Sequence, residues 1–155
     1  MPNPPLLTHT TVLEFKQFYV KHSPTTEIYT FDNIRVYFQP QKFGHAFYEN
    51  ANHRAGAKNQ FSQTRAERMD WIKATLQHPN AKIYEGWNKD TRTYDETRIV
   101  SVVYDDFVVV IELSLKKDNT LKGNFVTCYV ADKSISKIEQ SPLWDKQKCL
   151  EKLQK

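Results

Sequence analysis

Glycine is scarce in this sequence, with only four residues in 155. Phosphate-binding loops need closely spaced glycines, and neither a GxGxxG nor a Walker-type motif is present, which excludes the common glycine-rich nucleotide sites. Cysteine is also scarce. Cys128 and Cys149 lack CxxC spacing, which argues against a disulfide framework or a zinc site and favours a reducing compartment.

Long apolar runs are missing as well. The longest, FVVVI at 107–111, is too short to cross a membrane. The first residues, MPNPPLLTHTTVL, contain neither a basic segment nor an apolar stretch typical of a secretory signal. We therefore expect a cytoplasmic protein that does not contact the membrane.

The charge is mildly basic, at +4 with a pI near 9.0. This balance is compatible with a polyanionic partner, although a solvated surface explains the lysines equally well. Hydrophobic residues make up 39% and no low-complexity tract occurs, so one folded domain is expected. We place a flexible arm at 1–10, the domain at 11–145 and a basic tail at 146–155, which is either a partner-binding helix or a solvated end.

The coarse pattern is helices first and strands later, which predicts an α+β domain. A capping box formed by Thr11 and Glu14 opens a first helix, and Asp32-Asn33 sits between two short strands. The clearest helix is TRAERMDWIKATLQHP, with a second capping box from Thr64 and Glu67. Strands follow at 99–104, 107–115 and 125–130, with Asp105-Asp106 as a tight turn between the first two, and their short connections predict an antiparallel meander. After the strands we expect a short helix followed by a Ser-Pro break at 141–142.

Arg65 lies within the apolar stripe of that helix, on the same side as Met69, Ile72 and Leu76 at about 100° per residue. An unpaired buried guanidinium is costly, so Arg65 must reach a carboxylate or the solvent. Arg65 and Arg68 together form a phosphate-binding corner, or Arg65 instead forms a structural salt bridge with Glu or Asp or extends its charged end into solvent at the end of the helix.

The strand FVTCYV carries two hydroxyl groups on one of its faces. Alternation places Phe125, Thr127 and Tyr129 on one side, and Val126, Cys128 and Val130 on the core side. The hydroxyls of Thr127 and Tyr129 therefore either decorate the surface or line a site. Whether Glu112 and Ser114 of the preceding strand share that face depends on the sheet register.

His45 is the best candidate for moving a proton. It lies in KFGHAFY between aromatic residues, and an imidazole exchanges protons near neutral pH, although a packing role is the common alternative. His45 and His53 lack metal-ligand spacing, so no metal is expected. Cleavage of RNA without metal needs a base, an acid and donors for the phosphorane, which His45, Arg65, Thr127 and Tyr129 would supply if they converge.

Five segments in order resemble one family: KFGHAFYEN, RAERMDWIKATLQHP, YDDFVVVIEL, FVTCYV and IEQSPLW. They resemble phage-associated members of the metal-independent ribonuclease superfamily (BECR fold) that unites barnase, EndoU, colicin tRNases and RelE. The resemblance covers roughly residues 34 to 144. It implies N-terminal helices packed on a roughly four-stranded antiparallel sheet, with RNA across the exposed face.

The resemblance also implies roles for single residues. His45 would be the general acid or base, Thr127 and Tyr129 the hydroxyl pair of the late strand, and Arg65 the basic residue. We expect RNA contacts from Lys42, Arg68, Phe43 and Tyr48.

The function implied is a cofactor-free endoribonuclease, such as a toxin that cuts tRNA or another structured RNA to a 2′,3′-cyclic phosphate. Such an enzyme would have an immunity or antitoxin protein as partner. The alternative is a non-catalytic RNA- or protein-binding module, for instance a phage accessory factor.

Overall fold

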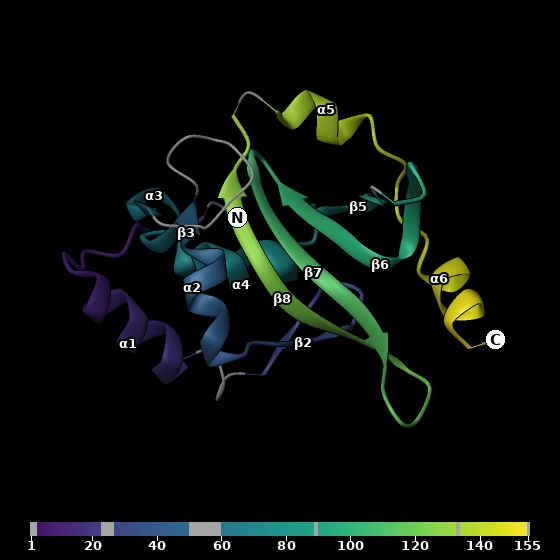
Figure 1. Cartoon of the computed structure of the whole chain (residues 1–155), viewed down its shortest axis with the longest axis horizontal. Coiled ribbons are helices and arrows are strands. Elements are labelled where there is room, and N and C mark those ends of the chain that lie inside the picture. Colours follow the sequence, from purple (N-terminus) through teal and green to yellow (C-terminus); the bar gives the residue numbers. More distant parts are fainter. Residues whose placement is uncertain (1–2, 23–26, 50–59, 89, 133, 155) are drawn as a thin grey trace.

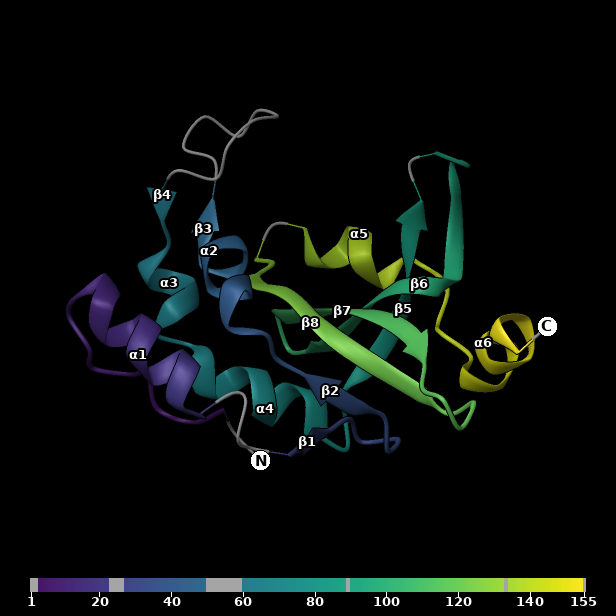
Figure 2. The ribbon, with the colours of Figure 1, turned by 60° about the horizontal axis from the view of Figure 1, so that its bottom comes forward.

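The computed structural model describes residues 3–22, 27–49, 60–88, 90–132 and 134–154. Its centre is a six-stranded sheet in the order β1-β2-β8-β7-β6-β5, and β3 and β4 form a separate two-stranded sheet (Figures 1 and 2). The strands are β1 (Ile28–Tyr29), β2 (Arg35–Tyr37), β3 (Tyr48–Glu49), β4 (Gln60–Phe61), β5 (Lys82–Asn88), β6 (Thr93–Tyr104), β7 (Phe107–Leu115) and β8 (Leu121–Val130). The helices are α1 (Val12–His22), η1 (Pro40–Lys42), α2 (Phe43–Ala46), α3 (Gln63–Ala66), α4 (Met69–Gln77), α5 (Ile135–Glu139) and α6 (Lys146–Leu153).

The strands β6, β7 and β8 pair as an antiparallel meander, as predicted, and β5 extends it by pairing with β6. The tight turn expected at Asp105-Asp106 is confirmed, because Tyr104 pairs with Phe107 and Asp105 has a φ of 56°. The hairpin expected around Asp32-Asn33 is confirmed too, with Asn33 at a φ of 69°. Asp and Asn are the residues that adopt this left-handed conformation most readily after glycine.

The predicted fold class is wrong in its architecture. The sheet has six strands and is mixed, because β2 pairs in parallel with β8, whereas a four-stranded antiparallel sheet under N-terminal helices was expected. The helices are short and spread along the chain. The β1-β2 hairpin extends the meander at the β8 edge, and this long-range pairing leaves no trace in the local hydrophobic pattern.

The long helix predicted at the centre of the chain is interrupted. α3 ends at Ala66 and α4 begins at Met69, with Glu67 and Arg68 in the connecting turn. The cap is Ser62, whose hydroxyl accepts from the Arg65 amide, so the capping box predicted for Thr64 and Glu67 is wrong. Arg65 therefore does not follow the helical phase of α4, which explains its place in an otherwise apolar stripe.

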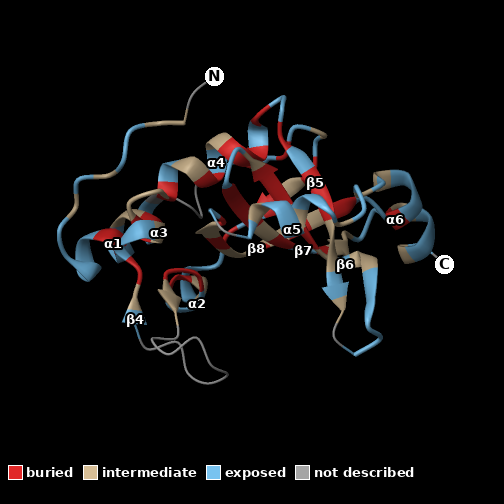
Figure 3. Ribbon diagram, turned by 90° about the horizontal axis from the view of Figure 1, so that it is seen from above, coloured by how far each residue is buried: buried red, intermediate tan, exposed pale blue. Residues whose placement is uncertain are grey.

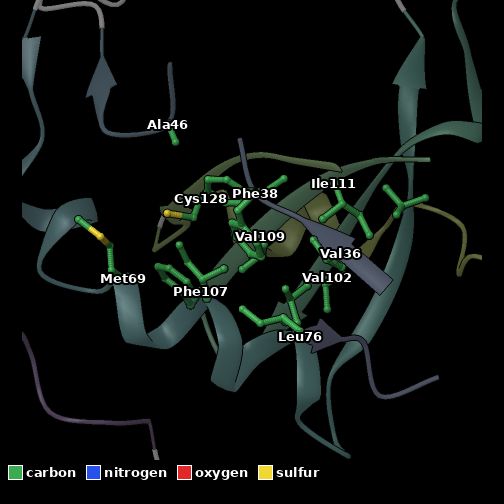
Figure 4. Close-up of a cluster of buried hydrophobic side chains, with 14 of the residues drawn as sticks. Val36, Phe38, Ala46, Met69, Leu76, Val102, Phe107, Val109, Ile111 and Cys128 are labelled. Carbon is green, nitrogen blue, oxygen red and sulfur yellow. The ribbon is translucent and has the colours of Figure 1, made fainter. Parts of the chain in front are cut away.

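The two faces of the sheet carry different side chains. On one face α4 buries Ile72 and Leu76 against the main core, part of which is drawn in Figure 4. On the other face α5 covers one end through Ile135 and Ile138, over a small cluster that includes Val108. Figure 2 shows α5 and α4 on opposite sides of the sheet, and Figure 3 shows buried strands beneath an exposed α5.

A β-bulge breaks the alternation of FVTCYV. Ile111 pairs with Phe125 but Val110 pairs with Thr127, so Val126 is the extra residue. Phe125 and Cys128 both belong to the main core, whereas Tyr129 packs in the cluster under α5. The expectation that Phe125 shares a face with Thr127 and Tyr129 is therefore wrong, and the bulge is the reason.

Both ends of the described chain contact the domain. In the segment 3–10, the Pro4 carbonyl accepts from the Trp71 indole at 2.6 Å, and the Leu7 amide donates to Glu67 at 2.8 Å. In α6, Cys149 is fully buried and Lys152 forms a salt bridge with Glu96. Within the described part of the chain, no helix has both the length and the apolar character that crossing a bilayer requires.

Candidate functional site

His45 lies on the exposed side of α2, a single turn that follows η1 without a break. Phe43, Ala46 and Phe47 anchor this turn because all three are buried in the main core. The rings of Phe43 and Phe47 pack on Tyr19, and their centroids lie 5.9 and 5.7 Å, respectively, from the centroid of the Tyr19 ring. The aromatic flanks of KFGHAFY therefore hold the backbone of α2, and His45 is presented at the surface beside them.

Arg65 acts on the end of α2. Its guanidinium donates to the carbonyl oxygens of Ala46 at 3.3 Å and Tyr48 at 3.5 Å. It also lies 3.6 Å from the carboxylate of Glu49, and its side chain is 18% exposed. The structural salt bridge, one of the two alternatives for Arg65, is thus present. In this arrangement Arg65 positions the backbone next to His45.

Thr127 reaches the same carbonyl. Its hydroxyl donates to the Ala46 oxygen at 3.3 Å, so β8 and α3 both bind the residue that follows His45. Two of the four predicted catalytic residues, Arg65 and Thr127, therefore meet at one junction, on the carbonyl of the residue that follows His45. The contacts of α2 with β8 and α3 could not be predicted from the spacing of these residues in the sequence.

Tyr129 lies two residues further along β8, near the same junction. Burial raises the pKa of its phenol above the ordinary value, and the nearby Arg65 guanidinium opposes the shift. The same two effects act on Cys128: burial raises the pKa of its thiol to about 12, and the Arg65 charge opposes the shift. At neutral pH both groups stay protonated, so Tyr129 acts as a neutral hydroxyl and Cys128 as an inert core residue.

The residues predicted to bind RNA differ in their exposure and in their contacts. Phe43 is 3% exposed, so its ring offers no face on which a base could stack. Lys42 and Tyr48 are half-buried around α2. Arg68 has partners of its own: it donates to the Thr64 carbonyl and the Glu67 carboxylate and lies 4.8 Å over the Trp71 ring, and it shares none of these contacts with Arg65. His53 lies outside the described residues.

The register settles the position of Glu112 and Ser114. Glu112 pairs with Asn124 and Ser114 with Lys122, on the face that Thr127 and Tyr129 share. Next to them on β2, Tyr37 pairs with Asn124 and Arg35 with Lys122. We call these six side chains the open face: Arg35, Tyr37, Glu112, Ser114, Lys122 and Asn124.

Sequence reasoning missed the cations of the open face. The Arg35 guanidinium lies 4.8 Å from the centre of the Tyr37 ring, and the Lys122 ammonium lies 5.7 Å from it. Arg35 also forms a 3.5 Å salt bridge with the exposed Glu27. The alternation around Val36 in the sequence already indicates that Arg35 and Tyr37 lie on the face opposite the core. Lys122 lies beside these two residues only because β2 pairs in parallel with β8, which the sequence does not reveal.

Among the described residues, no three His, Cys, Asp or Glu side chains are grouped so that they could hold a metal ion. The sequence matches no family model, and it matches neither a curated protein nor a solved structure.

Proposed function

We propose that this protein binds single-stranded RNA across the open face and cleaves it without metal at the junction beside His45. The observation that supports this most is the meeting of Arg65 and Thr127 on the Ala46 carbonyl. This contact joins α2, which carries His45, to α3 and to β8, the strand that carries Thr127 and Tyr129. The open face begins three residues earlier on β8, roughly 10 Å away along the strand.

The open face has the two kinds of group that RNA binding uses. Arg35 and Lys122 attract the phosphate backbone, and Tyr37, which is 36% exposed, offers an aromatic ring. Both cations lie close to the ring of Tyr37. Glu112 is the one acidic side chain among the six residues, and it lies on the far side of Asn124 from Tyr37.

The chemistry assigned to the junction is transesterification. The 2′-hydroxyl loses its proton to a base and attacks the phosphorus, while the bond to the 5′-oxygen breaks and that oxygen takes a proton from an acid. His45 serves one of these two proton transfers and solvent water serves the other, and the protonated Tyr129 hydroxyl donates a hydrogen bond to the phosphorane. Arg65 is a positioning residue in this scheme, since its contacts are to the backbone that carries His45.

The second candidate is an RNA-binding module without catalysis. It is favoured by the partners that the polar groups already have: Arg65 contacts two carbonyls and Glu49, and Thr127 donates to Ala46. RNA that binds on the open face does not need the Arg65 guanidinium or the Thr127 hydroxyl, so both can keep these partners. Both candidates predict RNA binding, and only the first predicts cleavage.

The deciding experiment incubates the purified protein with total tRNA and with an unstructured oligoribonucleotide in EDTA. The enzyme predicts fragments that end in a 2′,3′-cyclic phosphate, and it predicts that His45→Ala lowers the rate at least about 100-fold. Lys73→Ala, on the surface of α4, is the control and keeps the full rate. Tight binding without fragments would support the module, and fragments that persist in His45→Ala would overturn the role of His45.

A further inference from the structure

A cavity of about 570 Å³ lies between α5 and the hairpin of β5 and β6. Its volume is within the range of about 300–1,000 Å³ that is typical of ligand pockets. Trp87 and Tyr94 from the hairpin, Tyr129 from β8 and Lys137 from α5 are among the residues that line it. Figure 2 shows the hairpin rising on the same side of the sheet as α5.

A register shift builds the aromatic end of this cavity. The pairing of β5 with β6 jumps between Glu85, opposite Val100, and Gly86, opposite Asp95. A Cβ at Gly86 would lie 2.3 Å from the Ile99 carbonyl oxygen, so the two backbones approach closely only because residue 86 is glycine. Beyond the shift, Trp87 pairs directly with Tyr94 and both rings line the cavity.

The two rings are exposed in a way that folding does not explain. Trp87 is 55% exposed and Tyr94 is 39% exposed, and neither belongs to a hydrophobic cluster. Their centroids are 5.1 Å apart in a T-shaped contact, which fixes their orientation while most of the indole stays in solvent. An oriented and exposed indole is the kind of surface on which an unpaired base stacks.

The remaining lining is polar and suits a nucleotide. The exposed Lys137 supplies a positive charge for a phosphate, while Ser101 and Ser141 supply hydroxyls. Glu85 also lines the cavity and offers an acceptor for the amino groups of a base. Burial raises the pKa of both Tyr84 and Tyr129, so their phenols stay neutral and can donate hydrogen bonds.

We propose that the cavity binds one unpaired base of the RNA, with the base stacked on Trp87 and a neighbouring phosphate held by Lys137. This subsite rests on the proposed function, since the ligand is the RNA strand itself. Tyr129 links the two sites because it lines the cavity and also lies near the junction beside His45. A strand that crosses the junction therefore reaches the cavity with an adjacent nucleotide.

The test measures the affinity for a fluorescein-labelled single-stranded RNA whose 2′-O-methyl groups prevent cleavage. Trp87→Ala is expected to weaken binding at least about fivefold, the lower limit for losing one stacked base. Phe31→Ala, which removes an exposed ring outside the cavity, is the matched control and is expected to bind normally. Lys137→Ala is expected to lower the salt dependence by about one counterion, whereas Lys73→Ala leaves it unchanged.

A second readout uses the indole itself. Adenosine or guanosine 5′-monophosphate is expected to quench the tryptophan fluorescence of the wild type, and Trp87→Phe should abolish this quenching. If wild-type protein binds RNA and Trp87→Ala binds it equally well, the subsite is overturned while the proposed function stands. If the wild type binds no RNA at all, the proposed function fails and the subsite fails with it.

Discussion

Arg65 joins separate parts of the chain through one side chain. Its guanidinium donates to the carbonyls of Ala46, at the end of α2, and Tyr48, in β3, and it pairs with Glu49 of β3. The Arg65 side chain is largely shielded from water. If Arg65 is substituted, the two carbonyls lose a charged hydrogen-bond donor, and a water molecule replaces that donor poorly. The position of His45 depends on this contact.

Arg65→Gln is therefore expected to lower the free energy of unfolding by about 1–3 kcal/mol, the range for losing hydrogen bonds to a charged group. Chemical denaturation followed by circular dichroism measures this loss. Lys73→Gln, an exposed change on α4, should stay within about 0.5 kcal/mol. A variant as stable as the wild type that has lost only RNA cleavage would instead make Arg65 a group that acts on the RNA.

Some of these residue-level features can be read in the sequence. The capping box of Thr11 and Glu14 is confirmed by reciprocal hydrogen bonds of 3.1 Å, because both partners lie within one helical turn. The cost of burying Arg65 also marked it as a residue that needs a partner. Its actual partner, Glu49, comes from a segment whose place depends on tertiary packing, so no local rule identifies it.

At the scale of single elements, Gly86 controls the hairpin that carries Trp87 and Tyr94. The neighbouring atom is a backbone oxygen, which cannot move aside as a flexible side chain does. A side chain at this position must push β5 and β6 apart where their register changes. The aromatic pair would be displaced as a consequence.

Gly86→Ala is expected to lower the free energy of unfolding by about 1–3 kcal/mol, as overpacking does, and to weaken RNA binding. Gly44→Ala is the matched control, because nothing lies within 4 Å of a Cβ at Gly44. Since Gly44 is helical, that change should be neutral or stabilise the protein by about 0.5–1 kcal/mol. Thermal melts of both variants measure the contrast, and equal melting temperatures would contradict the packing argument.

Elements were predictable where their pattern is regular. The apolar segments at 99–104 and 107–115 and the Asp-Asp turn between them predicted the second half of β6 and all of β7, and Ser-Pro at 141–142 follows α5 as expected. The bulge at Val126 and the break at Glu67 and Arg68 were not predictable, because each inserts an irregular residue into a pattern that looks continuous. The bulge moves Phe125 to the core face, and the break takes Arg65 out of the helical phase of α4.

For the whole molecule, the parallel pairing of β2 with β8 has the largest consequence. It brings Arg35 and Tyr37 next to Lys122 and Asn124, from opposite ends of the chain, and so creates the open face. Such a pairing is set by the packing of Val36 in the main core, which local patterns do not report. The family resemblance implied a smaller antiparallel sheet and was wrong there; the ribonuclease activity it implied stays a prediction.

The most direct test of RNA binding on the open face is a map of amide chemical shifts during titration with 2′-O-methyl oligoribonucleotide. Binding as proposed predicts that the largest changes fall on Arg35, Tyr37, Lys122 and Asn124 and extend to Thr127. Residues of α4, on the opposite face, should not change. Changes confined to α1 and α4, or no changes at millimolar RNA, would contradict the account.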